Sequence, residues 1–328
     1  MRVRECELID RIYKALGGFR ASHQVHLGMG DDAALFRPRA GHELILTCDW
    51  FLEGTHFLRD KHPADSVGWK CLARALSDIA AMGGTPRCFL LSLALPGSHT
   101  GRWMDGFLAG LRRASRKFVC VLAGGDTTRR DNILINVTVV GEIRTGRAIR
   151  RSGAKDGDLI YVSGRLGEAA LGLAILKSGK RTVSSRDPRF QKHLYPEPRL
   201  ALGQWLAEKR LATSMIDISD GLSTDLRHLC PAPYLGALLD HDGFPALKVP
   251  ASLRTRIGDP LDLALHGGDD YELLFTARRW KLPSLPWKFR GLTISPIGYV
   301  TSGPNLVWMD PKNPRILHPG GWDPFRNE

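Results

Sequence analysis

The first half of the chain alternates between two spacings of apolar residues, one typical of helices and one typical of strands. Residues 5–17 form an amphipathic pattern that ends at a Gly-Gly pair, and Leu72, Leu76 and Ile79 recur at the spacing of one helix face. Short apolar runs bounded by glycine, proline or polar residues predict strands. We therefore expect an α+β arrangement, with helices over 5–17, 63–82 and 101–117 and strands over 43–48, 87–95, 118–123 and 132–143.

The second half follows a segment rich in Gly, Arg and Lys at 145–158, which we interpret as a joint between domains. Polar residues at 178–190 and a tail rich in Pro, Gly and Asn at 302–328 predict loops. The resulting domains are residues 1–145 and residues 146–328. In the second domain the pattern predicts strands over 158–163, 214–218, 271–276 and 293–300, and helices over 167–177, 198–209 and 222–230.

The composition is that of a soluble globular protein, because 43% of the 328 residues are hydrophobic and 24% are charged. No apolar run approaches the ~18 residues of a membrane span, so none is expected. The charged start, Met1–Glu7, lacks the apolar core of an export signal. The six cysteines include no Cys-x-x-Cys pair, and we expect reduced thiols in a cytoplasmic protein.

The net charge of +12 leaves two interpretations open. One is binding to nucleic acid, and the other is a basic surface that attracts small anionic substrates. The basic residues occur in small scattered clusters, such as 112–117, and neither an arginine-rich tail nor a known nucleic-acid motif accompanies them. We therefore favour anionic substrates and expect no nucleic-acid partner.

Aspartates in short motifs are the most informative chemical feature of the chain. Several of these motifs contain glycine, which lets a backbone approach a ligand closely. Aspartate supplies the hard oxygen ligands that Mg²⁺ prefers. The segment 267–272 repeats the style and has three acids in four positions, which favours metal or substrate contact over a turn. The aspartates of the other motifs are Asp32, Asp49, Asp78, Asp126, Asp217 and Asp220.

Each motif taken alone has a simpler interpretation. The segment 28–32 can be a turn, and 124–126, directly after an apolar strand, can be a hairpin turn. Asp78 can form an ion pair with Arg74, four residues earlier in the same helix. Asp220 can cap the helix that follows it.

The joint occurrence of the motifs is more informative than any one of them. Six carboxylates gathered in one site would repel each other by roughly 4 kcal/mol per close pair, even at a generous effective dielectric constant. Several Mg²⁺ ions would remove that repulsion and would also bridge the phosphates of a nucleotide. The sequence therefore predicts a site for metal and phosphate that is built without a P-loop, and the lone Gly-x-Gly at 28–30 is negligible as a dinucleotide-binding signal.

The ordered series of motifs resembles the thiamine-monophosphate kinase family, of the aminoimidazole ribonucleotide synthetase-like ATP-binding superfamily. The resemblance runs from about residue 28 to Trp322-Asp323-Pro324-Phe325. It implies an N-terminal α+β domain that binds ATP and Mg²⁺ and dimerises through its sheet, a C-terminal α/β domain, and an active site in the cleft between them. The motifs are Gly-Met-Gly-Asp-Asp-Ala, Thr-Cys-Asp, Glu-Gly-Thr-His-Phe, Leu-Ser-Asp-Ile-Ala-Ala-Met-Gly, Gly-Gly-Asp-Thr-Thr, Arg-Ser-Gly-Ala-Lys-x-Gly-Asp, Asp-Ile-Ser-Asp-Gly-Leu and Gly-Gly-Asp-Asp-Tyr-Glu-Leu.

The resemblance also implies roles for individual residues. The ligands of Mg²⁺ would be Asp32, Asp49, Asp78, Asp126, Asp217 and Asp220, with Thr47 and Cys48 beside them. Contacts to ATP would come from Gly125, Arg151 and Ser219, and contacts to thiamine phosphate from His56, Asp269 and Trp322. Two positions depart from the family pattern: Cys48 stands where a hydroxyl residue is common, and Asp269 replaces a usual glutamate, one methylene longer.

The reaction implied is the transfer of a phosphoryl group from ATP to thiamine phosphate, which gives thiamine diphosphate. The acceptor is a phosphate monoester that is largely dianionic near neutral pH, so no general base is expected and direct in-line transfer suffices. Two alternatives remain at this point. One is another ATP-dependent enzyme of the superfamily, such as a ligase acting on a purine intermediate, and the other is a basic nucleic-acid-binding protein.

Overall fold

The computed structural model describes residues 4–17, 24–179, 187–245, 247, 249 and 259–326. The chain divides into two compact units, which are described separately below. Unit 1 comprises Met1–Ile79, Gly84–Gly146 and Gly179–Pro196, and unit 2 comprises Ala80–Gly83, Arg147–Ser178 and Glu197–Glu328. Nowhere in the described part of the chain is a helix both long enough and apolar enough to cross a membrane.

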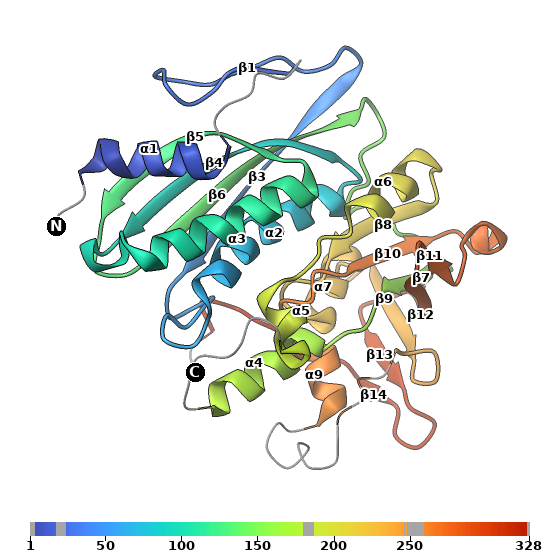
Figure 1. Ribbon diagram of the computed structural model, residues 1–328. Coiled ribbons are helices and arrows are strands. Elements are labelled where there is room, and N and C mark those ends of the chain that lie inside the picture. Colours follow the sequence, from blue (N-terminus) through green and yellow to red (C-terminus); the bar gives the residue numbers. More distant parts are fainter. Residues whose placement is uncertain are drawn as a thin grey trace. The chain divides into compact units, whose positions relative to one another are not determined.

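The sheet of unit 1 has the strand order β3-β6-β4-β5 (Figure 1). Neighbouring strands pair antiparallel except β4 and β5, which run parallel. A short hairpin of β1 and β2 precedes the sheet, and its connection contains the motif 28–32. The strands are β1 (Val25–Leu27), β2 (Leu35–Phe36), β3 (His42–Leu52), β4 (Thr85–Leu95), β5 (Val121–Arg129) and β6 (Leu134–Arg144).

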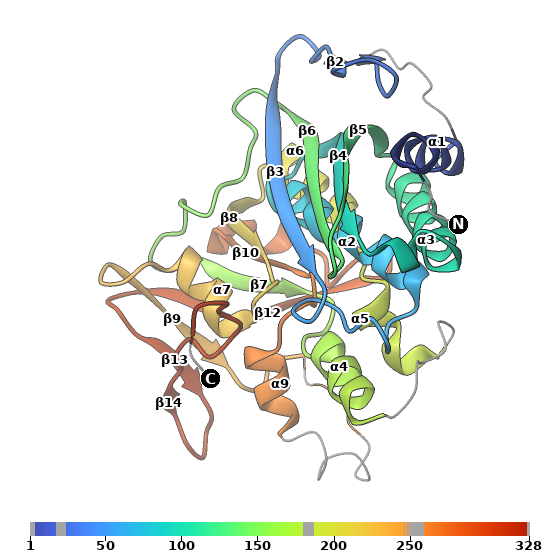
Figure 2. The ribbon, with the colours of Figure 1, turned by 90° about the vertical axis from the view of Figure 1, so that its left-hand side faces the viewer.

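Two long helices, α2 (Ala64–Ala81) and α3 (Arg102–Phe118), cover one face of this sheet (Figure 2). The helix α1 (Glu5–Ala15) lies against α3 and β5. The strand residues that face α2 and α3 are apolar and buried, among them Phe89, Leu93 and Val137. The two helices approach closely at Gly68, where a Cβ atom would lie 2.0 Å from the carbonyl oxygen of Phe107. Only glycine permits that backbone contact.

The predicted elements of unit 1 are confirmed except at β5. The strand expected over 118–123 begins at Val121, because Phe118 still belongs to α3. It then continues through 124–126, so the interpretation of this segment as a hairpin turn is wrong. Gly125 has φ +157°, and a Cβ atom there would lie 1.9 Å from the carbonyl oxygen of Leu91. The glycine therefore serves a close contact between neighbouring strands.

The sheet of unit 2 has the order β14-β13-β9-β12-β7-β10-β8, with β11 paired to β12. Its neighbours pair antiparallel except β13 and β9. The strands are β7 (Leu159–Ser163), β8 (Ala212–Asp217), β9 (Leu235–Asp240), β10 (Leu273–Ala277), β11 (Lys288–Phe289), β12 (Leu292–Ser302), β13 (Leu306–Met309) and β14 (Arg315–Ile316).

Helices pack against this sheet around a core that includes Val162, Ile216, Leu226 and Leu265. The helices of unit 2 are α4 (Glu168–Ser178), α6 (Leu200–Glu208), α7 (Leu222–Leu229) and α9 (Pro260–His266), while the short α5 (Gln191–Leu194) belongs to unit 1. The strands and helices predicted for this half are present. The two units of mixed helices and strands confirm the predicted two-domain fold class.

Among the described residues, five strands and α-helices of unit 2 were not predicted: β9, α9, β11, β13 and β14. The expectation of loops throughout 302–328 is wrong at 306–309 and 315–316. Leu306 and Trp308 are buried in the core of unit 2 and hold that part of the tail in the sheet. Residues 180–186 of the loop predicted over 178–190 lie outside the described residues.

Candidate functional site

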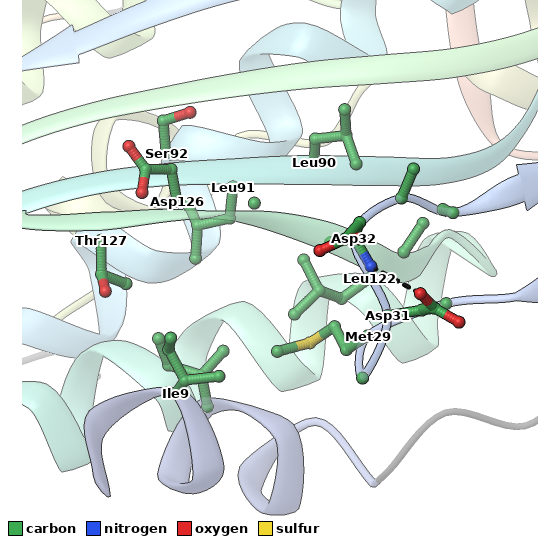
Figure 3. A pocket seen from close by; sticks show the side chains of 18 of the residues that line it. Ile9, Met29, Asp31, Asp32, Leu90, Leu91, Ser92, Leu122, Asp126 and Thr127 are labelled. Atoms are coloured by element: carbon green, nitrogen blue, oxygen red, sulfur yellow. Dashed lines mark hydrogen bonds between the residues drawn. The ribbon is translucent and has the colours of Figure 1, made fainter. Parts of the chain in front are cut away.

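A cavity of about 640 Å³ in unit 1 brings together three of the residues predicted from the motifs (Figure 3). Asp32 lies on the loop between β1 and β2, and Gly125 and Asp126 lie on β5. Ser92 of β4 pairs with Asp126 across the parallel strands and lines the same cavity. The loop that carries Asp32 turns at Gly30, with φ +118°. The cavity is thus bounded by two glycine-containing motifs that lie nearly 100 residues apart.

A second group in unit 1 lies between β3 and α2. The hydroxyl of Thr47 donates a hydrogen bond to the carboxylate of Asp78. Arg74 of the same helix pairs with Asp49 on the strand, with 3.7 Å between Nη2 and Oδ1. Its guanidinium also lies over the ring of Phe51 at 5.6 Å from the centroid. Thr47 and Asp49, two residues apart on the strand, therefore point to the same side of the sheet.

Cys48 lies between them on the strand and is exposed. Its Sγ is 3.2 Å from the side-chain oxygen and also from the side-chain nitrogen of Asn136, and it accepts a weak contact from the hydroxyl of Thr138 at 3.5 Å. Since side chains alternate along a strand, Cys48 points away from Thr47 and Asp49. Thr138 also lines the cavity described above, so the thiol contacts a wall of that cavity.

His56 lies just beyond β3, in the turn that follows the strand. Its Nδ1 accepts a hydrogen bond from the backbone N–H of Leu52 at 3.0 Å, and its ring lies 5.8 Å from that of Phe51. This contact fixes Nδ1 as the acceptor, so the neutral ring carries its proton on Nε2.

Two hydroxyl groups adjacent to predicted metal ligands are buried without a hydrogen-bond partner among the described residues. They belong to Ser77, which precedes Asp78 in α2, and Thr127, which follows Asp126 in β5. Buried polar groups are satisfied in most native structures, and exceptions often mark ligand or ion sites. Six buried side-chain nitrogen or oxygen atoms in the described residues have no hydrogen-bond partner, and these two lie beside motifs from which a phosphate and metal site was predicted.

In unit 2 the central feature is the loop between β8 and α7, which carries Ser219 and Asp220, while Asp217 ends the strand. The carboxylate of Asp225, in the first turn of α7, accepts hydrogen bonds from the backbone N–H groups of Ser219, Asp220 and Gly221 at 3.1, 3.1 and 3.0 Å. Asp225 was missed in the sequence, where it looks like an ordinary acid near a helix start. The interpretation of Asp220 as a simple N-cap is wrong, because Gly221 is the capping residue and makes no side-chain cap.

Two further predicted residues meet this loop through their backbones. The N–H of Asp269 donates to the carbonyl of Ser219 at 2.8 Å, and the N–H of Trp322 donates to the carbonyl of Asp220 at 2.9 Å. The indole of Trp322 is 50% exposed, so it does not serve as a core anchor for the tail. The structure thus brings Ser219, Asp220, Asp269 and Trp322 to one place, from segments that lie far apart in the sequence.

The acids at 269–272 do not act as a group. Asp270 is buried and accepts the N–H groups of Gly167 and Ala169 at 2.6 and 3.1 Å, at the start of α4. Glu272 is fully buried and pairs with Arg199 at 2.7 Å between Nε and Oε2. The expectation that all three acids contact metal or substrate is therefore wrong for these two. Asp269 differs, since it has φ +72°, an unusual conformation that often marks functional positions.

Negative charge accumulates around the 217–221 loop. Burial, together with the charges of Asp220 and Asp217, raises the pKa of Asp225 to about 8. Burial and the positive charge of Arg151 lower the pKa of His228 in α7 against the opposing charge of Asp220, so both Arg151 and Asp220 lie near this histidine. Within the described residues no group of three or more His, Cys, Asp or Glu side chains has a geometry that would hold a metal ion.

Comparisons with known proteins agree on one family. Residues 30–143 match the family model described as AIR synthase related protein, N-terminal domain. The thiamine-monophosphate kinase of Salmonella typhimurium is 40% identical over 275 residues, which cover 83% of this chain and 82% of that protein.

Two solved structures are similar over nearly the whole chain. One is the thiamine-monophosphate kinase of Stenotrophomonas maltophilia, with 36% identity and a TM-score of 0.79 over 94% of this chain and 97% of that chain. The other is described as AaThiL complexed with AMPPCP and TMP, with 31% identity and a TM-score of 0.76 over 99% of each chain. Because the similarity holds in sequence and in structure over most of the chain, this protein is an enzyme that belongs to the thiamine-monophosphate kinase family.

Proposed function

We propose that this protein transfers the γ-phosphoryl group of ATP to thiamine phosphate and releases ADP and thiamine diphosphate. The observation that carries the proposal is the convergence of Ser219, Asp220, Asp269 and Trp322 on the loop between β8 and α7. Family membership supports the same reaction, as does the similarity to a kinase complexed with AMPPCP and TMP. A purine-intermediate ligase or a nucleic-acid-binding protein would leave both supports unexplained.

The substrate side is assigned to three residues. An exposed indole such as that of Trp322 offers a flat surface for the cationic thiazolium or the pyrimidine of thiamine. Asp269 supplies a carboxylate beside the same loop, and the Nε2–H of His56 is the polar group that its ring can present to a phosphate. We assign Gly125, Arg151 and Ser219 to ATP, since glycine backbone, guanidinium and hydroxyl groups all suit phosphates.

Magnesium ions are assigned to Asp32, Asp49, Asp78, Asp126, Asp217 and Asp220, with Thr47 and Cys48 beside them. The donor set fits the metal, because carboxylate oxygens are its preferred ligands. The unpartnered hydroxyls of Ser77 and Thr127 and the crowded acids around Asp225 support a local demand for cations. When bound, Mg²⁺ neutralises charge on the transferring phosphoryl group. Cys48 is assigned a neighbouring position only, since its thiol faces Asn136 and Thr138.

The residues of the chain contribute positioning and charge. Thiamine phosphate is already a dianionic nucleophile near neutral pH, so no side chain has to remove a proton from it. Trp322 and Asp269 orient the acceptor, and Arg151 and the glycine-rich backbone at Gly125 hold the donor. Transfer is then direct and in line, without a phosphoenzyme, and the catalytic gain comes from alignment.

We further propose that the protein acts in the cytoplasm as a homodimer that pairs through the sheet of unit 1. The outer face of β3 supports this, because Leu44, Leu46 and Trp50 alternate along it and are 43%, 67% and 56% exposed. Exposed apolar side chains gathered on one strand face favour burial against a partner. In this proposal residues 1–145 form the dimerising domain that binds ATP and Mg²⁺, and residues 146–328 form the second domain.

The decisive experiment incubates the purified protein with ATP, Mg²⁺ and thiamine phosphate and separates the products by chromatography. We expect ADP and thiamine diphosphate in equal amounts. Thiamine without its phosphate is the matched control acceptor and should give neither product. ATP hydrolysis without thiamine diphosphate, or no consumption of ATP at saturating substrates, would refute the assignment.

A further inference from the structure

Asp225 organises the loop between β8 and α7 from inside. One oxygen of its carboxylate accepts the backbone N–H groups of Ser219, Asp220 and Gly221, at 3.0–3.1 Å. The residue is 2% exposed, so these N–H groups are withdrawn from solvent. A run of adjacent backbone N–H groups before a helix is otherwise a ready site for an external anion. Here an oxygen of the chain's own carboxyl group occupies that place.

This arrangement determines which backbone groups the loop turns outward. With the N–H groups directed to Asp225, the carbonyls of Ser219 and Asp220 are left to accept the N–H groups of Asp269 and Trp322, at 2.8 and 2.9 Å. The backbone of this loop is therefore bonded on two sides. Its N–H groups donate to the carboxyl group of Asp225, and its carbonyl groups accept the N–H groups of two residues assigned to thiamine phosphate.

Two glycines bring the other segments close enough for these contacts. A Cβ atom at Gly268 would lie 2.5 Å from the carbonyl oxygen of Ser219, and one at Gly321 would lie 2.1 Å from that of Asp220. The tail is fastened further by the N–H of Gly321, which donates to the hydroxyl of Thr224 at 3.1 Å. The hydrogen bonds to the carbonyls of Ser219 and Asp220 therefore require glycine at positions 268 and 321, where a side chain would push the segments away.

We infer that Asp225 is a positioning residue of the kinase reaction: by holding the backbone of residues 219–221 it places Ser219 and Asp220, and through their carbonyls Asp269 and Trp322. The inference rests on the proposed function, because it gives Asp225 a part in the recognition of both substrates. It differs from an ordinary helix-start acid, whose loss would weaken the helix and leave the substrate contacts of folded protein unchanged.

The test compares Asp225→Asn and Asp225→Ala with Asp158→Asn as a matched control. Asp158 is equally buried in unit 2 and accepts hydrogen bonds from the N–H of Lys155, from Thr213 and from Arg278 at 3.1, 2.8 and 2.9 Å, without contact to the loop. Steady-state kinetics are measured at a temperature where all variants remain folded, as judged by circular dichroism.

For Asp225→Asn we expect kcat/KM for thiamine phosphate to fall about tenfold or more, since each buried N–H group that loses its acceptor costs roughly 1–3 kcal/mol. The Mg²⁺ concentration for half-maximal rate should rise in parallel. Asp225→Ala should be worse, because the asparagine oxygen still accepts part of the N–H set. Asp158→Asn should lower the melting temperature and keep both KM values within about twofold, as a purely structural change does. Kinetics of Asp225→Asn that match this control would overturn the inference.

A second measurement decides the question even if the wild-type protein proves inactive on thiamine phosphate, which would refute the proposed function alone. Amide hydrogen exchange followed by mass spectrometry reports the protection of peptides that contain residues 219–221, Asp269 and Trp322. In Asp225→Asn we expect faster exchange in all three, while Asp158→Asn leaves them protected. Unchanged protection at Asp269 and Trp322 would show that Asp225 does not position them, whatever the substrate.

Discussion

Replacing Trp322 by alanine tests the substrate side of the site most directly. The backbone N–H of this residue, which bonds the carbonyl of Asp220, is retained in the variant, so the tail keeps its attachment. The residue is 50% exposed, so at most half of its surface is lost from contacts with the protein. Truncation of a fully buried tryptophan costs about 3–5 kcal/mol, and we expect well under half of that for Trp322→Ala.

The expected loss in binding follows from the exposed half of the ring. A tryptophan presents roughly 200 Å², so about 100 Å² remains for a ligand to cover, and a flat ring stacked on one face removes roughly half of it. At about 25 cal/mol per Å² this burial gives ~1.3 kcal/mol, near the 0.5–2 kcal/mol of a cation–π contact. A single contribution of ~1.3 kcal/mol corresponds to about a tenfold change in affinity.

The assay measures KM for thiamine phosphate and for ATP, with thermal melting in parallel. We expect Trp322→Ala to raise KM for thiamine phosphate about tenfold and to leave KM for ATP and the melting temperature nearly unchanged. Trp322→Phe should recover part of the affinity. Trp287, 73% exposed in the same unit and outside the loop region, is the matched control, and Trp287→Ala should leave both constants unaltered. A markedly lower melting temperature for Trp322→Ala with an unchanged KM would show that the indole is structural and that the C-terminal substrate assignment is wrong.

Four further outcomes are expected. Chelation by EDTA should abolish activity, and Asp126→Asn should reduce turnover by orders of magnitude with the far-UV spectrum unchanged; a fully active variant would remove Asp126 from the metal site. Asp269→Asn, which tolerates the observed φ of +72°, should raise KM for thiamine phosphate more than KM for ATP, whereas equal changes would assign Asp269 to the metal cluster or to the fold. Gly125→Ala should lower the free energy of unfolding by about 3 kcal/mol or more in urea titrations, because its Cβ would lie 1.9 Å from a neighbouring carbonyl oxygen, and a near-neutral result would contradict the strand geometry. Burial alone would raise the pKa of Glu142, but hydrogen bonds and charges from Arg39 and Arg87 outweigh it and lower that pKa. The ionised carboxylate therefore stabilises the folded protein above the unfolded pKa, and this stabilisation is lost as pH falls through the folded pKa. Glu142→Gln should therefore be less stable at neutral pH and lose less on acidification, and parallel stability curves for the two proteins would refute this.

The long elements were predictable because periodicity survives wherever one face of an element is buried. The helix α2 and the strands β4 and β6 present apolar residues to the same core, so their spacing alone identified them. Short elements such as β13 and β14 were not predictable, since only a few of their residues enter the core and proline and glycine surround them. The prediction for β5 was wrong for a different reason. Its glycines resemble those of a turn in the sequence, and only the position of β4 in the structure shows that Gly125 permits close contact between the two strands.

The candidate site also contains residues that the sequence identified and residues that it could not distinguish. The acids next to glycines stood out in the sequence, because acids in such positions have few structural uses. The motif at 267–272 shows the limit of that argument. Asp270 and Glu272 are satisfied by the start of α4 and by Arg199, partners about 70 to 100 residues away along the chain, and nothing local in the sequence distinguishes them from Asp269.

Residues that hold or admit the backbone of the 219–221 loop could not be recognised from the sequence either. Asp225 lies where acids favour any helix start, so its type and place carry no separate signal. Gly268 and Gly321 lie in segments where glycine suggests a turn or a loose tail, yet each allows a contact to a carbonyl of the 219–221 loop. It follows that transferring the recognisable motifs to another chain would not rebuild this site. Asp220, Asp269 and Trp322 reach their places because the internal carboxyl group of Asp225 directs the loop's N–H groups inward and two glycines admit the segments that bind its carbonyls.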